Sequence, residues 1–265
     1  MSYGEKTRGG KKEPPIPTSQ IINSDILPPI ENLDLTPLEE IIRKVPISNI
    51  DDIRDPVLRL EAEGTQAFES GDSFSGGEKF KQAMDLLIKE KRKQELVRIL
   101  ADAASLSFHS NHLQLVKDFA RRLLKYGEEI GSLVHMGQAH YFIGAAYLRE
   151  KENATKGLEY LVQASISFDK SGEFVVAGLC DQLIGDHYLA QQNLFQADLY
   201  YIEAIKFYQK GRHESPLLQK LAKMNPSDVD KKLATLIADL KSNLTKLTDP
   251  KERSKIDTEL KKLKL

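Results

Sequence analysis

Apolar residues recur at helical spacing along most of the chain. Between Pro56 and Pro216 no proline occurs, and apolar positions return every three or four residues among Leu, Ala, Glu, Lys and Gln. This periodicity is typical of amphipathic helices with one buried face. The sustained alternation that marks strands is absent, as are Asn-Gly and Asp-Gly hairpin turns. The pattern therefore predicts an all-α protein.

The first 54 residues differ from the rest. They hold seven of the eleven prolines, and each proline removes a backbone donor and disfavours helix at the residue before it. We expect residues 1–54 to be a disordered, proline-rich tail. Within it, residues 37–44 follow a capping-box pattern and predict one short helix. That helix either docks onto a partner or folds onto the main body.

Two further regions follow the tail. The pair Asp55-Pro56 is a suitable helix start, and residues 55–213 form the expected helical repeat domain. Residues 214–265 are expected to be capping helices with a basic end. Three prolines, each after a potential N-cap residue, mark the starts of these helices: Pro216, Pro226 and Pro250.

One uncharged run has the length of a membrane-spanning helix. It extends over nineteen residues from Ile130 to Leu148. Three glycines, two histidines, a serine and a glutamine within it offset much of the apolar gain of transfer. A buried helix in a helical array is therefore the better interpretation.

Small and aromatic residues repeat at a fixed spacing within the helical region. Gly185 is followed by Tyr188, by Ala197 twelve residues after the glycine, and then by Tyr201 and Ala204. Small residues let two helices approach closely, and the tyrosines fill the remaining space. Earlier copies keep the twelve-residue spacing and have an alanine seven positions later. Their paired positions are Gly64 and Gly76, Ala101 and Leu113, and Ala145 and Gly157.

This spacing resembles the tetratricopeptide repeat, in which antiparallel helix pairs stack into a right-handed α-solenoid. The second-helix markers fall at 76, 113, 157 and 197, so the steps exceed the period of 34 in that repeat. The longer steps and the helical C-terminal region are also similar to the SNAP family of attachment proteins in vesicle fusion. That family grips a helical bundle with a curved array of helix pairs. The resemblance predicts four divergent helix pairs.

The tetratricopeptide resemblance implies a concave groove lined by the first helix of each pair. In the family, set positions of that helix point into the groove and contact a partner peptide or helix. A mixture of charged, polar and aromatic side chains suits such a ligand. The matching positions in this sequence are Glu61, Thr65, Phe68, Arg98, Asp102, Ser105, Phe142, Ala146, Arg149, Gln182, Asp186 and Leu189.

Reactive side chains are sparse. Cys180 is the single cysteine, which excludes an intramolecular disulfide framework and any multi-cysteine metal site. The six histidines form no His-Glu-x-x-His pattern. We expect no catalytic residues, no cofactor, no metal and no small-molecule substrate, and therefore a non-enzymatic protein.

The charge of the chain is balanced, with 38 basic and 39 acidic residues, which argues against a dedicated nucleic-acid binder. No signal-peptide pattern opens the chain, so we expect it to be cytoplasmic.

The main hypothesis is a scaffold or adaptor that binds a peptide or helix of a partner protein. Two alternatives stay open. One is a SNAP-like adaptor in membrane trafficking, held at a membrane through its partner. The other is a nucleic-acid regulator that uses the basic C-terminal helices, where residues 216–265 hold 12 Lys and Arg against 7 Asp and Glu.

Overall fold

The computed structural model describes residues 50–150, 153–211 and 216–263. A short 3-10 turn, η2 (Ile50–Asp52), precedes the first α-helix, and every further element in these ranges is helical. The all-α prediction is therefore confirmed for the described residues. The α-helices are α2 (Pro56–Glu69), α3 (Ser73–Lys89), α4 (Lys93–His109), α5 (Leu113–Glu129), α6 (Leu133–Glu150), α7 (Ala154–Ser171), α8 (Phe174–Ala190), α9 (Leu194–Lys210), α10 (Pro216–Ala222), α11 (Pro226–Lys246) and α12 (Pro250–Lys262).

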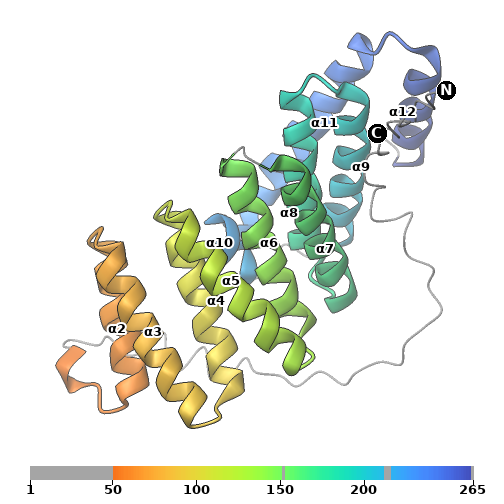
Figure 1. Cartoon of the computed structure of the whole chain (residues 1–265). Helices are drawn as coiled ribbons and strands as arrows, with labels where there is room; N and C mark the ends of the chain where they lie inside the picture. Colours follow the sequence, from red (N-terminus) through yellow and green to blue (C-terminus); the bar gives the residue numbers. More distant parts are fainter. Residues whose placement is uncertain (1–49, 151–152, 212–215, 264–265) are drawn as a thin grey trace, which may run out of the picture.

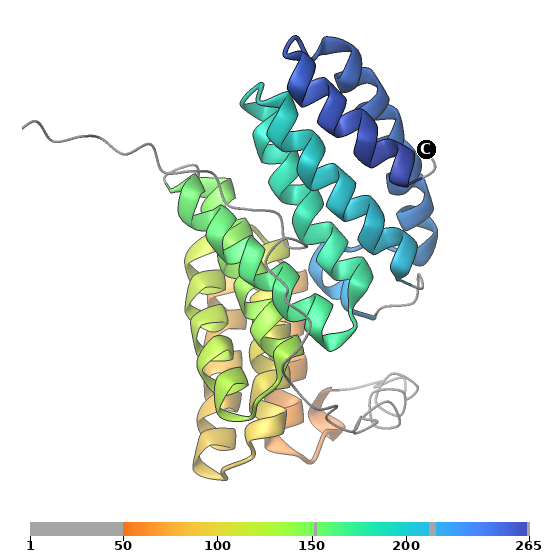
Figure 2. The same ribbon diagram turned by 90° about the vertical axis from the view of Figure 1, so that its right-hand side faces the viewer.

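The helices pack in the order of the chain as antiparallel pairs (Figure 1). The pairs are α2 with α3, α4 with α5, α6 with α7, and α8 with α9, and each pair contacts the next. Helices α11 and α12 pack against α9 and continue the array at its C-terminal end (Figure 2). The predicted array of sequential helix pairs is confirmed at this level.

Acidic and amide side chains begin several helices at the predicted prolines. The carboxylate of Asp55 accepts the N–H groups of Val57 and Leu58 at the start of α2, and Asp249 caps α12 in the same way. Such caps satisfy donors that have no partner within the helix. Helices α10 and α11 also begin at their prolines. The predicted short helix at 37–44 lies outside the described residues.

Most of the turns between helices are of one kind. In each, one residue has a left-handed backbone, and the N–H of the next residue returns to a carbonyl in the last helical turn. At Lys91, φ is 61°, and the N–H of Arg92 bonds to the carbonyl of Leu87 at 3.0 Å. This Schellman arrangement satisfies carbonyls at the helix end. The first four left-handed positions lie twenty residues apart. Turns of this kind have their left-handed residue at Gly71, Lys91, Asn111, Gly131, Gly172 and Gln192, and a different turn follows α10 at the left-handed Lys223.

Glycines bring the helices of a pair into close contact. A Cβ on Gly64 would lie 3.2 Å from the carbonyl oxygen of Gly76, as the twelve-residue spacing predicts. In the third pair the partner of Gly157 is Gly144, one residue before the predicted Ala145. A Cβ on Gly144 would lie 2.8 Å from the backbone oxygen of Gly157. The small residues therefore set the distance between paired helices.

The uncharged run predicted to be a buried helix forms most of α6. Half of the residues of α6 are buried, including Tyr141 and Phe142. In the described part of the chain, no helix combines the length and the apolar character needed to cross a membrane. The apolar side chains of α6 instead belong to the continuous core of the array.

Helix α10 departs from the sequential order. It follows α9 in the chain but packs against α4 and α8, beside α6 in the middle of the array (Figure 1). After α10 the chain returns to α9, against which α11 packs. The chain therefore places a short helix of its own on the face formed by α4, α6 and α8.

Candidate helix-binding site

Three side chains of the array donate hydrogen bonds to backbone carbonyls of α10. The hydroxyl of Ser105 on α4 donates to the carbonyl of Lys220 at 2.6 Å. His109 Nε2, one turn further along α4, lies 3.0 Å from the same oxygen. The hydroxyl of Tyr141 on α6 donates to the carbonyl of Leu221 at 3.3 Å. Together with Asp102, these three residues form what we call the α10 seat.

The carbonyls that these donors reach lie in the last turn of α10. The final four carbonyls of a helix have no partner within the helix, so they need outside donors when they are buried. Beyond Ala222 the chain turns at Lys223, where φ is 51°, and the N–H of Met224 returns to the carbonyl of Leu218 at 3.3 Å. The seat therefore contacts the C-terminal end of α10.

The contact with α10 and the burial of the ring together define the state of His109. A carbonyl oxygen accepts only, so His109 must carry a hydrogen on Nε2 to make this bond. Burial lowers the pKa of His109, and the nearby charges of Lys223 and Arg149 lower it further, against the opposing effect of the carbonyl. The imidazole is therefore neutral at pH 7 and acts as a hydrogen-bond donor.

A chain of alternating charges runs through the seat. Lys220 Nζ lies 2.6 Å from Asp102 Oδ1, and Arg98 Nη1 lies 3.3 Å from the other oxygen of Asp102. Arg98 in turn binds Glu61 on α2 through two hydrogen bonds of 2.5 and 2.7 Å. These side chains are only 18–27% exposed, so their attraction is screened less than that of a surface pair. The network joins α2, α4 and α10.

Apolar contacts complete the docking of α10. Leu218 is 1% exposed and Leu221 is fully buried. The two leucines are three residues apart and therefore share one face of the helix. Burying leucine side chains stabilises by about 1.5–3 kcal/mol each. The hydrogen bonds and the ion pair thus orient a helix that is held mainly by its apolar face.

The predicted groove residues fall into several environments. Asp102 and Ser105 contact α10, and Glu61 and Arg98 belong to the same charge network. The hydroxyl of Thr65 bonds to a carbonyl of its own helix. Four others are buried or partly buried: Phe68 packs against Phe80 on α3, Phe142 packs against Phe108, Ala146 is buried, and Leu189 packs on the core. Arg149 is exposed, but its guanidinium lies over the ring of Phe108 and donates to the Phe108 carbonyl.

Gln182 and Asp186 line a separate pocket of about 370 Å³ between α8 and α11. The hydroxyl of Tyr208 donates to Gln182, and that of Tyr201 donates to Asp186, both at 2.8 Å. Burial raises the pKa of Asp186, although the bond from Tyr201 opposes that shift. Lys232 on α11 faces the same pocket. These two predicted residues therefore lie apart from the α10 seat.

His109, Tyr141 and the whole of α10 are absent from the residues that sequence reasoning selected. The repeat pattern points to side chains of the first helices, whereas α10 comes from outside the repeats. One sequence signal does exist. Pro216 and Pro226 leave room for only a short helix between them, and such a helix cannot supply a repeat unit.

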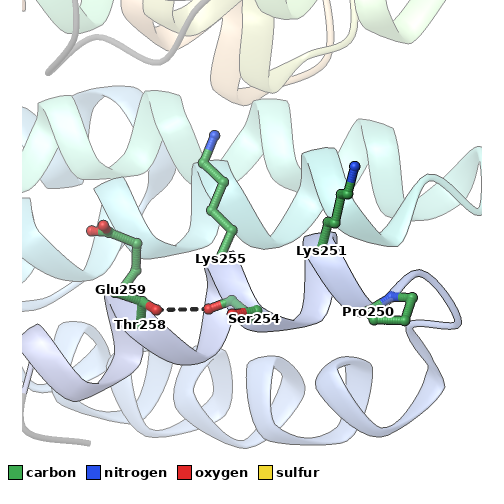
Figure 3. Close-up of a pocket in the computed structure, with 6 residues that line it drawn as sticks. All are labelled: Pro250, Lys251, Ser254, Lys255, Thr258 and Glu259. Carbon is green, nitrogen blue, oxygen red and sulfur yellow. Dashed lines mark hydrogen bonds between the residues drawn. The ribbon is translucent and has the colours of Figure 1, made fainter.

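A second cavity of about 510 Å³ lies along α12 (Figure 3). Its lining comes from that helix alone, and Lys251 and Lys255 extend from the same side of it. Lys255 lies over the ring of Phe195 on α9, with its Nζ 5.6 Å from the ring centre. Surface lysines on one helix do not define a ligand, so we assign none to this cavity.

No group of three or more His, Cys, Asp or Glu side chains in the described ranges could hold a metal ion. The chain was also compared with known protein families, with curated proteins and with solved structures, and none of these comparisons gave a match. The functional assignment therefore rests on the side chains of the α10 seat.

Proposed function

We propose that this protein is a non-enzymatic adaptor that binds a helical segment of a partner protein. The array is assigned to the tetratricopeptide type, with right-handed stacking, and its binding face is formed by α4, α6 and α8. One observation carries the proposal. This face already holds a seven-residue helix, α10, through side-chain donors to backbone carbonyls.

Recognition through the backbone suits an adaptor. Ser105, His109 and Tyr141 bond to carbonyls, which every helix offers, so these contacts place few demands on ligand sequence. The donors are held in position by the surrounding core, because Tyr141 is 3% exposed and Ser105 is 7% exposed. A preformed site lowers the ordering cost of binding a short helix.

The test uses peptides selected for binding rather than proteins captured from cells. The full chain with Leu218→Ser and Leu221→Ser, which we call the α10-released variant, serves as bait for a display library of helical peptides. Ser105→Ala with Tyr141→Phe is then introduced into the bait. We expect this pair to weaken the selected peptides about fivefold or more, because two hydrogen bonds are lost.

The matched control is Asp118→Ala with Arg121→Ala on the exposed surface of α5, where both side chains are more than half exposed. We expect this pair to leave peptide binding unchanged. Selected helices that bind equally to the bait with and without the seat substitutions would place the binding site elsewhere and contradict the proposal.

A further inference from the structure

The α10 seat selects a particular kind of helix end. Two donors, Ser105 and His109, bond to the single carbonyl oxygen of Lys220. A carbonyl oxygen has two lone pairs, so both are occupied from outside the helix. A helix that continued past this point would direct its own N–H at the same oxygen. The seat therefore suits a ligand whose helix stops at this turn.

The side chains of α10 show which residue types occupy the last turn of a helix docked in the seat. Leu218 and Leu221 are buried in the array, and Lys220 between them reaches the carboxylate of Asp102. The resulting pattern is Leu-x-Lys-Leu. In a fully apolar seat the lysine would be unpaired and costly, so Asp102 makes this position selective for a basic residue.

The same pattern ends the other two C-terminal helices. Leu-x-Lys-Leu occurs at 244–247 in α11 and at 260–263 in α12. In these copies the leucines pack on the core, while Lys246 is exposed and Lys262 pairs with Glu259 of its own helix. In all three helices the leucines of the pattern pack onto the array, and among the described residues the lysine of α10 is the one that pairs with an acid of the repeats.

The helices on either side of α10 in the chain are held together without it. Helices α9 and α11 pack directly against each other, so this contact does not depend on whether α10 is docked. A tethered segment acts at a high effective concentration, in the millimolar range. A partner must therefore bind the seat more tightly than α10 does in order to replace it.

We propose that the seat binds the C-terminal turn of a partner helix carrying Leu-x-Lys-Leu, and this proposal rests on the proposed function above. Helix α10 is the internal copy that competes for the same site. The ligand is thus a basic, leucine-bearing helix end, and binding it expels α10. The adaptor is closed when alone and opens only to a ligand that makes the same contacts.

The probe for this proposal is a fluorescent peptide with a helix-forming Ala/Glu-rich extension that ends in Leu-Leu-Gln-Lys-Leu-Ala-amide. The extension brings the length to about 16 residues, because shorter helices are marginal in water. A matched peptide has Glu in place of Lys. Binding of both is measured by fluorescence anisotropy with the wild-type chain and with the α10-released variant.

We expect the lysine peptide to bind the α10-released variant about tenfold more tightly than the wild-type chain, where α10 competes. We expect the glutamate peptide to bind the released variant about tenfold more weakly than the lysine peptide. Asp102→Asn in the released variant should remove that difference, since it keeps the shape of the side chain and removes its charge.

The possible outcomes distinguish this proposal from the proposed function as a helix-binding adaptor. Equal binding of the two peptides to the released variant overturns the lysine specificity but leaves a helix-binding face. Equal affinity of the lysine peptide for the wild-type and released chains shows that α10 does not compete, and overturns its role. If neither these peptides nor the library-selected helices bind through the seat, both proposals fail.

A measurement on the wild-type chain covers the case in which the released variant does not fold. Hydrogen exchange is followed with and without saturating lysine peptide. We expect faster exchange at residues 217–224 and unchanged protection in α11, because the peptide replaces α10 alone. Binding with unchanged exchange at 217–224 would contradict displacement.

Discussion

The hydroxyl of Ser105 lies 2.6 Å from the backbone oxygen of Lys220, a residue 115 positions further along the chain. This bond joins the second helix pair to a short helix that follows the fourth. A hydroxyl that donates to a buried helix-end carbonyl satisfies an acceptor that would otherwise be unpaired. Ser105 is therefore expected to stabilise the closed form of the protein.

The first prediction concerns that hydroxyl. Ser105→Ala is expected to lower the free energy of unfolding by about 1 kcal/mol, because a buried carbonyl loses a donor. Thr235→Ala is the control, since the exposed hydroxyl of Thr235 bonds to a carbonyl of its own helix. Urea unfolding monitored by circular dichroism measures both. If the two substitutions lower the free energy of unfolding equally, the bond to Lys220 contributes nothing to the stability of the fold.

The second prediction concerns Arg98 and Glu61. Their bidentate pair is 27% and 18% exposed, so a double-mutant cycle with Glu61→Gln and Arg98→Met should give a coupling of about 1 kcal/mol. The control cycle uses Asp118 and Arg121, whose charged atoms are 3.9 Å apart on an exposed surface. Its coupling is expected to be near zero. Similar couplings in the two cycles would contradict a structural role for the Arg98 pair.

This pair also shows why groove residues were harder to assign than helices. Sequence spacing placed Arg98 and Asp102 on one face of a helix, and the structure places both there. The spacing carries no information about what covers that face. Glu61 already binds Arg98, and Lys220 already binds Asp102, so neither is free for a ligand in the closed form.

The regularity of the turns was likewise hidden in the sequence. Four of the left-handed turn positions lie twenty residues apart, but three of the six in the turns between α2 and α9 are occupied by residues other than glycine: Lys91, Asn111 and Gln192. A left-handed backbone is signalled in sequence mainly by glycine and to a lesser degree by asparagine. The repeat was therefore visible through its close-packed small residues and not through its connections.

The third prediction concerns those close contacts. Gly144→Ala would place a Cβ 2.8 Å from the backbone oxygen of Gly157 and 2.9 Å from Leu161. A backbone atom cannot move aside, so we expect a loss of about 2–3 kcal/mol in the free energy of unfolding. In Gly77→Ala the nearest atom is the end of the flexible Leu115 side chain, at 3.3 Å.

Gly77 is thus the matched control for Gly144. The better helix propensity of alanine offsets a small steric cost at this position, and we expect Gly77→Ala to change stability by less than about 1 kcal/mol. Thermal and urea unfolding of the two variants are compared with the wild-type chain. A small effect at Gly144 would show that α6 and α7 can separate at little cost, against the tight packing described above.

The fourth prediction concerns a buried carboxyl on α9. Asp198 is fully buried, and its Oδ1 accepts a hydrogen bond of 2.9 Å from Asn243 on α11. Its Oδ2 has no hydrogen-bond partner among the described residues. Burial raises the pKa of Asp198 to about 6 from the ordinary value of 3.8, although the bond from Asn243 opposes the shift.

The direction of the pH effect follows from this raised pKa. The folded chain binds the proton of Asp198 more tightly than the unfolded chain does. The protonated carboxyl therefore contributes its full share to the free energy of unfolding below pH 4, and this contribution is lost as the pH rises through 6. Asp198→Asn keeps the bond to Asn243 and cannot ionise. The free energy of unfolding of the variant should therefore equal that of the wild-type chain near pH 4 and exceed it by up to about 3 kcal/mol above pH 7.

Urea unfolding at pH 4, 5, 6, 7 and 8 measures this difference in the free energy of unfolding. The control for removal of a charge alone is Asp85→Asn at an exposed position on α3. A difference that does not grow between pH 4 and 7 would show that Asp198 is already ionised in the folded chain at low pH, and that α9 and α11 tolerate a buried charge between them.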